Sequence, residues 1–173
     1  MSAEDKIRNG ENIILIGMMG SGKSAVGKEL GCELEHRGYK FVDLDEHIEK
    51  HHGKIADIFA TRGEDDFRFL ESNALQVFTD KTRIIISTGG GVLKNEENIS
   101  ILRQLGTIFY LQAPANVLYE RIKGDIGRPL LKSFNEFEKT LEEREENYKL
   151  ADHIVDAQRS PRDVAQEVLR RWN

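Results

Sequence analysis

One eight-residue stretch constrains the fold of this chain more than any other part of its sequence. Residues 17–24 read Gly-Met-Met-Gly-Ser-Gly-Lys-Ser and fit the pattern G-x-x-x-x-G-K-[S/T]. An apolar run at 12–16 precedes the stretch, and a segment with helical spacing follows it from Lys23 to about Arg37. A strand that enters a helix through such a loop aims backbone N–H groups and the helix N-terminus at phosphate oxygens. We therefore expect nucleotide binding at this phosphate loop, by Gly20, Ser21, Gly22, Lys23, Ser24 and Ala25.

Two side chains of the phosphate loop have expected roles of their own. Lys23 should reach the β- and γ-phosphates of ATP, and the hydroxyl of Ser24 should ligate Mg²⁺. The alternative is a glycine-rich turn that fits the pattern by chance. The strand before the loop and the helix after it argue against that alternative.

Apolar runs and helical segments alternate along the rest of the chain. Further strands are expected at 41–43, 83–87, 107–111 and 153–156, and helices at 45–52, 55–61, 64–79, 94–105, 115–123 and 161–171. This alternation predicts one α/β domain over residues 1–173, with a core at 12–170 and a parallel sheet covered by helices on both faces. Ligands collect at the carboxyl ends of such strands, here 17–24, 43–45 and 87–91. The long irregular segment at 124–135 is predicted to be a mobile lid.

Composition excludes several classes of protein. A net charge of −5 argues against a general nucleic-acid binder. Cys32 is the single cysteine, so no internal disulfide can form, and we expect it to be a small core residue of the first helix. No apolar run approaches the ~18 residues that a membrane span needs. The first residues carry charges of both signs and no apolar core, unlike a secretory signal, so a cytoplasmic location is expected.

Two carboxylates follow the second strand. Asp43 and Asp45 lie two residues apart, whereas the strand at 84–86 runs into Ser-Thr-Gly-Gly-Gly without a carboxylate. This pattern is more typical of small-molecule kinases than of motor-like or signalling NTPases. Asp43 could hold a Mg²⁺-bound water, and Asp45 could accept a proton from a substrate hydroxyl or orient it. Asp45 fits a helix N-cap equally well, so both roles stay open for it.

The acceptor side has two further features. Arg68 could be a solvated helix arginine paired with Glu64 four residues earlier. The three consecutive glycines Gly89, Gly90 and Gly91 are harder to explain structurally, because glycine weakens a chain end and usually allows close approach of a ligand to the backbone. A backbone surface of this kind suits a polyhydroxylated or carboxylated small molecule.

Four arginines in the second half of the chain are further candidates for site residues. Arg121 is expected at a helix end, Arg128 lies within the predicted lid, and Arg159 precedes the last helix. An arginine that closes over the γ-phosphate would stabilise the charge that develops during transfer and would exclude water. Arg144 has four glutamates around it at 142–146, and on local grounds it fits an exposed helical ion-pair set.

Taken together, these motifs resemble the shikimate kinases over nearly the whole chain, from about Asn12 to Arg170. The resemblance is carried by residues 17–24, Asp-Leu-Asp at 43–45, and the segments 53–59, 63–71, 87–92, 127–131 and 144–148. It implies a three-layer α/β/α P-loop kinase fold like that of the nucleoside monophosphate kinases. It also implies ATP-dependent phosphorylation of the 3-hydroxyl of shikimate in the chorismate pathway, with Mg²⁺ and no nucleic-acid or membrane partner. We expect a monomer.

The resemblance also assigns roles to individual residues. It makes Asp45 the partner of the acceptor hydroxyl, Asp43 a residue of the magnesium shell and Arg128 the lid cation that acts in catalysis with Lys23. Arg68 and Arg144 would hold the shikimate carboxylate beside the 89–91 backbone, and Arg121 and Arg159 would flank the adenine. For Arg68 and Arg144 these roles replace the local interpretations.

Departures from the family pattern are small. Ala25 follows Ser24 where threonine is commoner, residues 142–146 are more acidic than usual, and Asn147 stands where leucine is frequent. One rival hypothesis is a kinase for another small hydroxy acid such as gluconate, which should lack this combination of motifs. A second is a silent nucleotide-binding module, which should have lost Lys23, Asp45 or Arg128.

Overall fold

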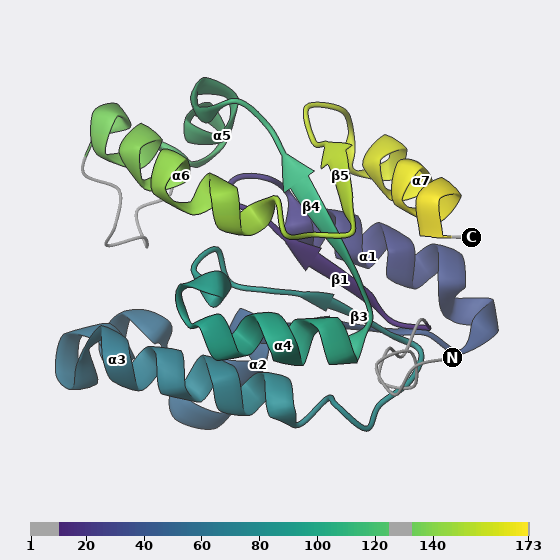
Figure 1. Cartoon of the computed structure of the whole chain (residues 1–173), viewed down its shortest axis with the longest axis horizontal. Coiled ribbons are helices and arrows are strands. Elements are labelled where there is room, and N and C mark those ends of the chain that lie inside the picture. The colour runs from purple at the N-terminus through teal and green to yellow at the C-terminus, as the bar shows by residue number, and fades with distance from the viewer. Residues whose placement is uncertain (1–10, 125–132, 173) are drawn as a thin grey trace.

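The structure of the protein is a computed structural model that describes residues 11–124 and 133–172. At its centre is a sheet of five parallel strands in the order β2-β3-β1-β4-β5, between helices on both faces (Figure 1). The prediction of a three-layer domain with about five parallel strands is confirmed. The strands are β1 (Ile13–Ile16), β2 (Lys40–Asp43), β3 (Ile84–Ser87), β4 (Thr107–Gln112) and β5 (His153–Asp156). The helices are α1 (Lys23–Leu34), α2 (Leu44–His52), α3 (Ile55–Gln76), α4 (Glu96–Leu105), α5 (Ala115–Ile122), α6 (Phe134–Tyr148) and α7 (Pro161–Trp172), with short 3₁₀-helices η2 (Glu35–Arg37) and η3 (Val92–Lys94).

The first strand is the middle strand of the sheet. β1 pairs with β3 on one side and β4 on the other, and its four apolar side chains are no more than 1% exposed. Helix α1 packs against α7 on one face, and α4 packs with α3 on the other (Figure 1). Because all strands run parallel, the phosphate loop after β1, Asp43 at the end of β2 and the glycines after β3 come together at one edge of the sheet.

Asn12 connects three segments of the chain at the opposite edge of the sheet. Its side chain is fully buried, and its amide donates hydrogen bonds of 2.8 Å to the carbonyl oxygens of Lys81 and Leu105. Its Oδ1 accepts a bond of 3.0 Å from the backbone N–H of Ile84. One polar side chain thus ties the start of β1 to the start of β3 and the end of α4. The sequence placed Asn12 within the first strand and gave no sign of this role.

The helices differ from the predictions in three main places. Helix α6 was not among the predicted helices, and its first residues fall in the segment that was expected to be irregular. The segments expected at 55–61 and 64–79 form one helix, α3, that is broken at Gly63, where the backbone is non-helical with φ at 86°. The helix expected from residue 94 begins at Glu96, because the side chain of Asn95 accepts a hydrogen bond from the N–H of Glu97 and caps the helix. Residues 92–94 form η3 instead.

Cys32 is exposed, so the prediction of a core residue was wrong. The buried side of α1 is formed by Val26, Leu30 and Leu34 at helical spacing. Cys32 lies two positions from both leucines, and a displacement of two residues turns a side chain by about 200° around a helix, toward solvent.

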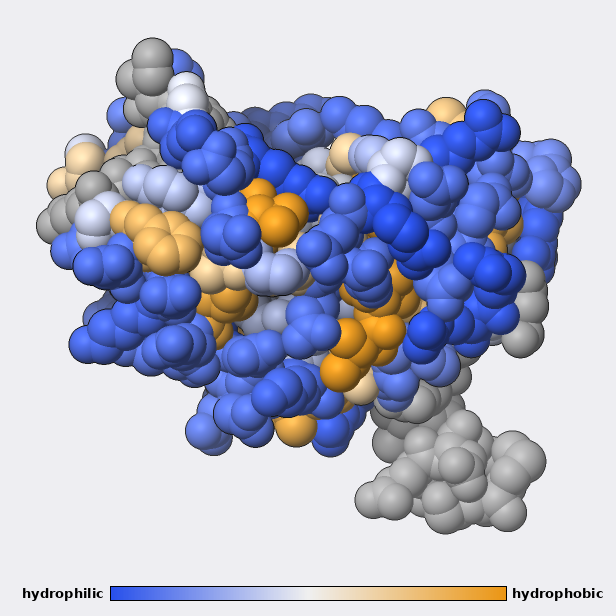
Figure 2. Space-filling view, turned by 90° about the horizontal axis from the view of Figure 1, so that it is seen from above, coloured by the Kyte–Doolittle hydropathy of each residue, from blue (hydrophilic) through white to orange (hydrophobic). Residues whose placement is uncertain are grey.

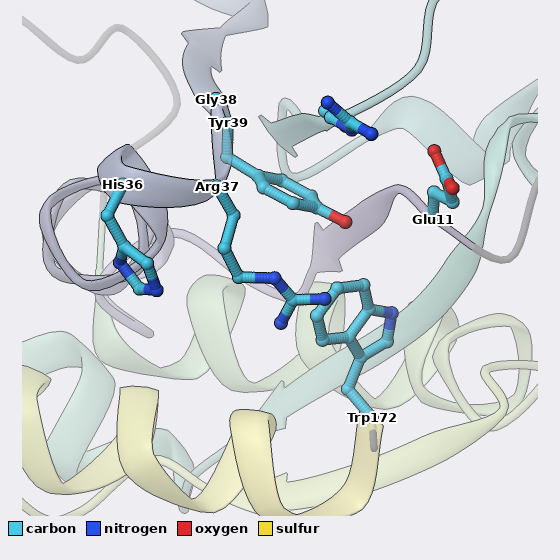
Figure 3. Close-up of a pocket in the computed structure, with 7 residues that line it drawn as sticks. Glu11, His36, Arg37, Gly38, Tyr39 and Trp172 are labelled. Atoms are coloured by element: carbon cyan, nitrogen blue, oxygen red, sulfur yellow. The ribbon is translucent and has the colours of Figure 1, made fainter.

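The C-terminal helix is held by a stack of aromatic rings and a guanidinium. The rings of Tyr39 and Trp172 meet edge to face with centroids 5.6 Å apart, and the guanidinium of Arg37 lies 5.4 Å from the centroid of Trp172 (Figure 3). These side chains line a hollow of about 750 Å³ together with Glu11 and Arg83. Tyr39 and Arg83 directly precede β2 and β3, so the hollow is at the amino ends of the strands, away from the phosphate loop.

The surface in Figure 2 is mostly hydrophilic, with hydrophobic side chains in small separate groups. Phe69 on α3 and Val77 directly after it are among the large apolar side chains that are exposed. Single apolar side chains of this kind are normal on protein surfaces. None of the helices within 11–124 and 133–172 has the length and apolar character required to cross a membrane.

Candidate active site

The phosphate loop has the backbone geometry that its sequence predicts. Gly20 and Gly22 both have φ near 85°, a left-handed conformation that glycine adopts without strain. A methyl group on Gly20 would also lie 2.6 Å from the carbonyl oxygen of Leu118 in α5. The ammonium of Lys23 is mostly buried and donates to the carbonyl oxygens of Gly17, at 2.7 Å, and Met18, at 3.1 Å. The loop is thus wrapped around Lys23 at the N-terminus of α1.

Ser24 and Asp43, the two residues predicted to hold Mg²⁺, lie side by side. The Ser24 hydroxyl donates a hydrogen bond to Oδ2 of Asp43 and lies 3.4 Å from the hydroxyl of Ser87. A hydroxyl and a carboxylate are the oxygen ligands that Mg²⁺ prefers. Across 11–124 and 133–172, no cluster of three or more His, Cys, Asp or Glu side chains could hold a metal. The pair therefore fits an ion that keeps waters and nucleotide phosphates as its other ligands.

Asp43, and not Asp45, caps helix α2. Oδ1 of Asp43 accepts hydrogen bonds from the backbone N–H groups of Asp45, at 3.1 Å, and Glu46, at 3.2 Å. The N-cap alternative for Asp45 was therefore wrong by two residues. Asp45 lies in the first turn of α2.

Asp45 lies where two cavities meet. One, of about 400 Å³, follows the phosphate loop and is lined by Lys23, Ser24 and Asp43 among others. The second, of about 600 Å³, lies between α2, α3 and the glycine segment. Three residues line both cavities: Met19, Asp45 and Gly90. A group bound in the second cavity can therefore reach the end of a nucleotide bound in the first.

Arg68 points into the second cavity and is held by two glutamates. Its Nη1 donates a bond of 2.7 Å to Oε2 of Glu71, and its Nη2 one of 3.1 Å to Oε1 of Glu64. The predicted Glu64 pair is present, and Lys94 joins it with a bond of 2.8 Å to the same Glu64 oxygen. Arg68 is thus an oriented cation at the cavity wall and not a solvated helix arginine.

Glu71 ends the 63–71 segment that carries the family resemblance, but the sequence interpretation gave it no role in the site. Its side chain is fully buried, and its Oε1 has no hydrogen-bond partner among the described residues. Burial raises the pKa of its carboxyl from 4.5 to about 7, and the nearby Arg68 opposes this only in part. The spacing of three residues between Arg68 and Glu71 was the one available signal, since side chains at that spacing meet on a helix.

Arg144 lies in the wall of the second cavity and is about nine-tenths buried. Its Nη1 donates to the carbonyl oxygen of Gly90, at 3.2 Å, and contacts Sδ of Met18 at 3.6 Å. Of the glutamates around it, Glu145 instead accepts a hydrogen bond of 2.9 Å from Gln112. No ion pair joins Arg144 to another residue in the described part of the chain. The exposed ion-pair set that its local sequence suggested is therefore wrong.

The three glycines make room for the functional side chains around them. A methyl group on Gly89 would lie 2.6 Å from Oε1 of Glu71 and 2.9 Å from Oδ1 of Asp45. On Gly91 it would lie 2.4–2.8 Å from the guanidinium atoms of Arg68. The carbonyl of Gly90 accepts hydrogen bonds from both Arg144 and the hydroxyl of Tyr148. The segment is thus packed against the acceptor site on all sides.

Three further arginines were predicted at the nucleotide. Arg121 donates to the carbonyl oxygens of Gly20, at 3.1 Å, and Ala157, at 2.9 Å, and so joins the phosphate loop to the segment before α7. Arg159 is exposed two residues beyond Ala157, in the same segment. The structure therefore places Arg121 and Arg159 on one side of the loop. Arg128 and most of the predicted lid at 124–135 lie outside the described residues.

Known proteins resemble the chain over nearly its full length. The model of the family described as shikimate kinase matches residues 19–173. A shikimate kinase of Persephonella marina is 42% identical, over 92% of this chain and 98% of that protein. A solved shikimate kinase of Acinetobacter baumannii, in complex with shikimate, superposes with a TM-score of 0.86 at 32% identity and covers 96% of this chain and 95% of its own. A gluconokinase of Sinorhizobium meliloti has a TM-score of 0.61 at 19% identity, a likeness of fold alone.

Proposed function

The chain belongs to the shikimate kinase family, and from that premise we propose how its residues divide the work of the reaction. It is an enzyme that phosphorylates shikimate, with ATP as phosphoryl donor and a divalent metal typical of kinases. The observation that carries the assignment of roles is the meeting of the nucleotide and acceptor cavities at Asp45. We infer that the 3-hydroxyl of shikimate is the acceptor and that shikimate 3-phosphate and ADP are the products.

The donor half of the site is the phosphate loop. Backbone N–H groups of residues 20–25 bind the phosphates, and Lys23 leaves its carbonyl partners to contact the β- and γ-phosphates. Ser24 would ligate Mg²⁺ and Asp43 would hold a water of its shell, and the bound ion would supply charge neutralisation of the phosphates. Arg121 and Arg159 flank the adenine. These assignments are supported by the Ser24–Asp43 hydrogen bond and by the position of Arg121 against the loop.

The acceptor half binds the carboxylate and orients the hydroxyl. Arg68 and Arg144 bind the shikimate carboxylate with charge-assisted hydrogen bonds, while the backbone at 89–91 lies against the ring. Glu71 positions Arg68. Asp45 accepts the proton of the hydroxyl as its oxygen bonds to the γ-phosphorus and the bond from that phosphorus to the β,γ-bridging oxygen breaks. The catalytic role of Arg128, the lid, the cytoplasmic location and the monomeric state stay predictions.

The direct test is release of ADP with Mg-ATP in the presence of shikimate, gluconate or no acceptor. Release that depends on shikimate alone is the expected result. Release with gluconate would transfer the assignment to the rival hydroxy-acid kinase. Release with neither acid, or none at all, would contradict the assigned acceptor.

Alanine at Gly91 and at Gly89 should affect different kinetic constants. The methyl group of Gly91→Ala displaces the Arg68 guanidinium, which binds the carboxylate, so the KM for shikimate should rise about 10- to 100-fold, the worth of one charged hydrogen bond. The methyl group of Gly89→Ala meets Asp45 and Glu71, so kcat should fall further than KM rises. Steady-state kinetics of both variants measure this split, and each is the control of the other. The prediction would be contradicted if Gly91→Ala and Gly89→Ala changed kcat and KM by the same factors.

The free energy of unfolding of the protein should change with pH because Glu71 titrates. Its pKa is higher in the folded state, at about 7, than its ordinary 4.5, so the folded state binds the proton more tightly. This contribution to stability is complete below pH 4.5 and is lost as the pH rises through about 7, an effect of about 3 kcal/mol. Urea unfolding from pH 4.5 to 8 should show the wild type losing stability relative to Glu71→Gln, which keeps an acceptor for Arg68.

Glu64→Gln is the matched control for this titration. Hydrogen bonds from Lys94 and Arg68 hold the pKa of Glu64 below its usual value. The stabilisation from Glu64 is therefore complete above about pH 4.5 and lost only below it, so Glu64→Gln should show no comparable change between pH 4.5 and 8. A stability difference between wild type and Glu71→Gln that stays constant over this pH range would refute the assignment to Glu71.

A further inference from the structure

A third cavity lies behind Arg144, on the side of α6 and η3. It has a volume of about 420 Å³, and we call it the side pocket. It shares Met19, Gly90, Gly91 and Arg144 with the acceptor cavity, but neither Asp45 nor Arg68 reaches it. The residues that line the side pocket and not the acceptor cavity are Met18, Leu93, Lys94, Phe137, Thr140, Glu143, Asn147 and Tyr148.

The lining of the side pocket combines apolar side chains with three charged ones. Met18, Leu93 and Phe137 are buried members of the core, and methionine adapts to ligands of different shape. Arg144 and Lys94 are the cations of the lining, and Glu143 is its one carboxylate. Such a cavity, at the small end of the range for ligand sites, suits a molecule with an apolar body and a single negative charge. A second carboxylate on the ligand would be repelled by Glu143.

Arg144 has donors left for such a charge. Its Nη1 is bonded to the carbonyl of Gly90, whereas its buried Nε has no hydrogen-bond partner in the described part of the chain. A buried guanidinium with an unsatisfied donor is costly, and an anion that bonds to it lowers that cost. Because Arg144 lines both cavities, the anion can come from either side.

We propose that the side pocket binds a small apolar monocarboxylate whose carboxylate pairs with Arg144. This rests on the proposed function in one respect, that Arg144 also holds the carboxylate of shikimate. One guanidinium then serves two anions in turn, and an acid in the side pocket competes with shikimate without entering the acceptor cavity. The side pocket is an inhibitory site next to the catalytic one.

The first test compares benzoate and 3-phenylpropionate with the uncharged benzamide. Binding is measured by calorimetry without substrates, and inhibition is measured from ADP release over a range of shikimate concentrations. The acids should inhibit competitively against shikimate, and benzamide should bind at least about 10-fold more weakly because it lacks the charged hydrogen bonds. Equal binding of acid and amide, or no binding of either acid, would overturn the proposal.

The second test fills the side pocket. Thr140 lines it and not the acceptor cavity, and its hydroxyl is bonded to the carbonyl of Glu136 in its own helix, at 2.8 Å. Thr140→Trp should weaken benzoate binding at least 10-fold and leave the KM for shikimate unchanged. Lys139→Trp, which adds the same ring one residue away outside the lining, is the matched control. Asn147→Phe fills the pocket from two turns further along and serves if Thr140→Trp does not fold.

The outcomes separate this inference from the proposed function. If Thr140→Trp and Asn147→Phe both leave the inhibition by benzoate unchanged, the acid binds in the acceptor cavity and the side pocket has no such role, although shikimate kinase activity stands. If benzoate binds by calorimetry and Thr140→Trp abolishes that binding, but benzoate does not compete with shikimate, the shared use of Arg144 is refuted. If ADP release does not depend on shikimate, the proposed function fails, and the calorimetric comparison still tests the site.

Discussion

Asp45→Asn lowers kcat by about 10²- to 10⁴-fold, the usual contribution of a positioned general base, and leaves nucleotide affinity near the wild-type value. The reason is the position of Asp45 between the two cavities, with Asp43 and not Asp45 forming the cap of α2. The asparagine keeps the shape of the side chain and its hydrogen bonds to a hydroxyl, but it cannot take the proton. Steady-state turnover and calorimetric binding of an ATP analogue measure the two effects separately.

Asp57→Asn is the matched control for this variant. Asp57 also lines the acceptor cavity, but it is exposed in the first turn of α3 and contributes no side-chain contact to the reacting groups. Its turnover should stay within a few-fold of the wild type. If Asp45→Asn keeps near-normal turnover, Asp45 orients substrate at most and the catalytic role must be withdrawn.

Asn12→Ala lowers the free energy of unfolding by about 3–5 kcal/mol. The variant removes the hydrogen-bond partner of two buried backbone groups, at Ile84 and Leu105, and of the partly buried carbonyl of Lys81, and each buried group left unsatisfied costs about 1–3 kcal/mol. Urea denaturation of the purified variant measures the change.

Asn95→Ala provides the comparison for Asn12→Ala. Asn95 caps α4 by accepting a hydrogen bond of 3.1 Å from Glu97, and loss of a cap of this type costs about 1 kcal/mol. Both variants replace asparagine by alanine. The difference between their losses in free energy of unfolding therefore measures the effect of the surroundings of each side chain. A loss at Asn12 no greater than the loss at Asn95 would show that water replaces the lost partners.

The parts of the site that are local in sequence were predictable. The phosphate loop, its strand and its helix are contiguous, so pattern and context together locate Lys23 and Ser24. The parallel sheet follows from alternating elements, which brings Asp43 and the glycines after β3 to the same edge. For these residues, the order of the elements and the chemistry of the side chains predict the same place for the site.

Other parts depend on contacts between distant segments. Arg144 lies among glutamates in sequence, but the fold buries it against Met18 and Gly90, 126 and 54 residues away. Only the family resemblance, and not its local surroundings, assigned it to the substrate. Glu71 was missed for a similar reason, because its burial depends on how α3 packs beside Gly89. The choice between Asp43 and Asp45 as helix cap depended on a shift of two residues, finer than spacing alone resolves.

The central position of β1 has a consequence for synthesis on the ribosome. β1 is made first, but its neighbours β3 and β4 begin only at residues 84 and 107. At typical rates of about 5–20 residues per second, the interval from residue 13 to residue 84 lasts roughly 4–14 s. During that time Ile13–Ile16 is an apolar strand with no partner on either side, the kind of segment that nascent-chain chaperones bind. Slow translation of the segment between β1 and β3 would therefore prolong the period in which this chain is most prone to aggregate.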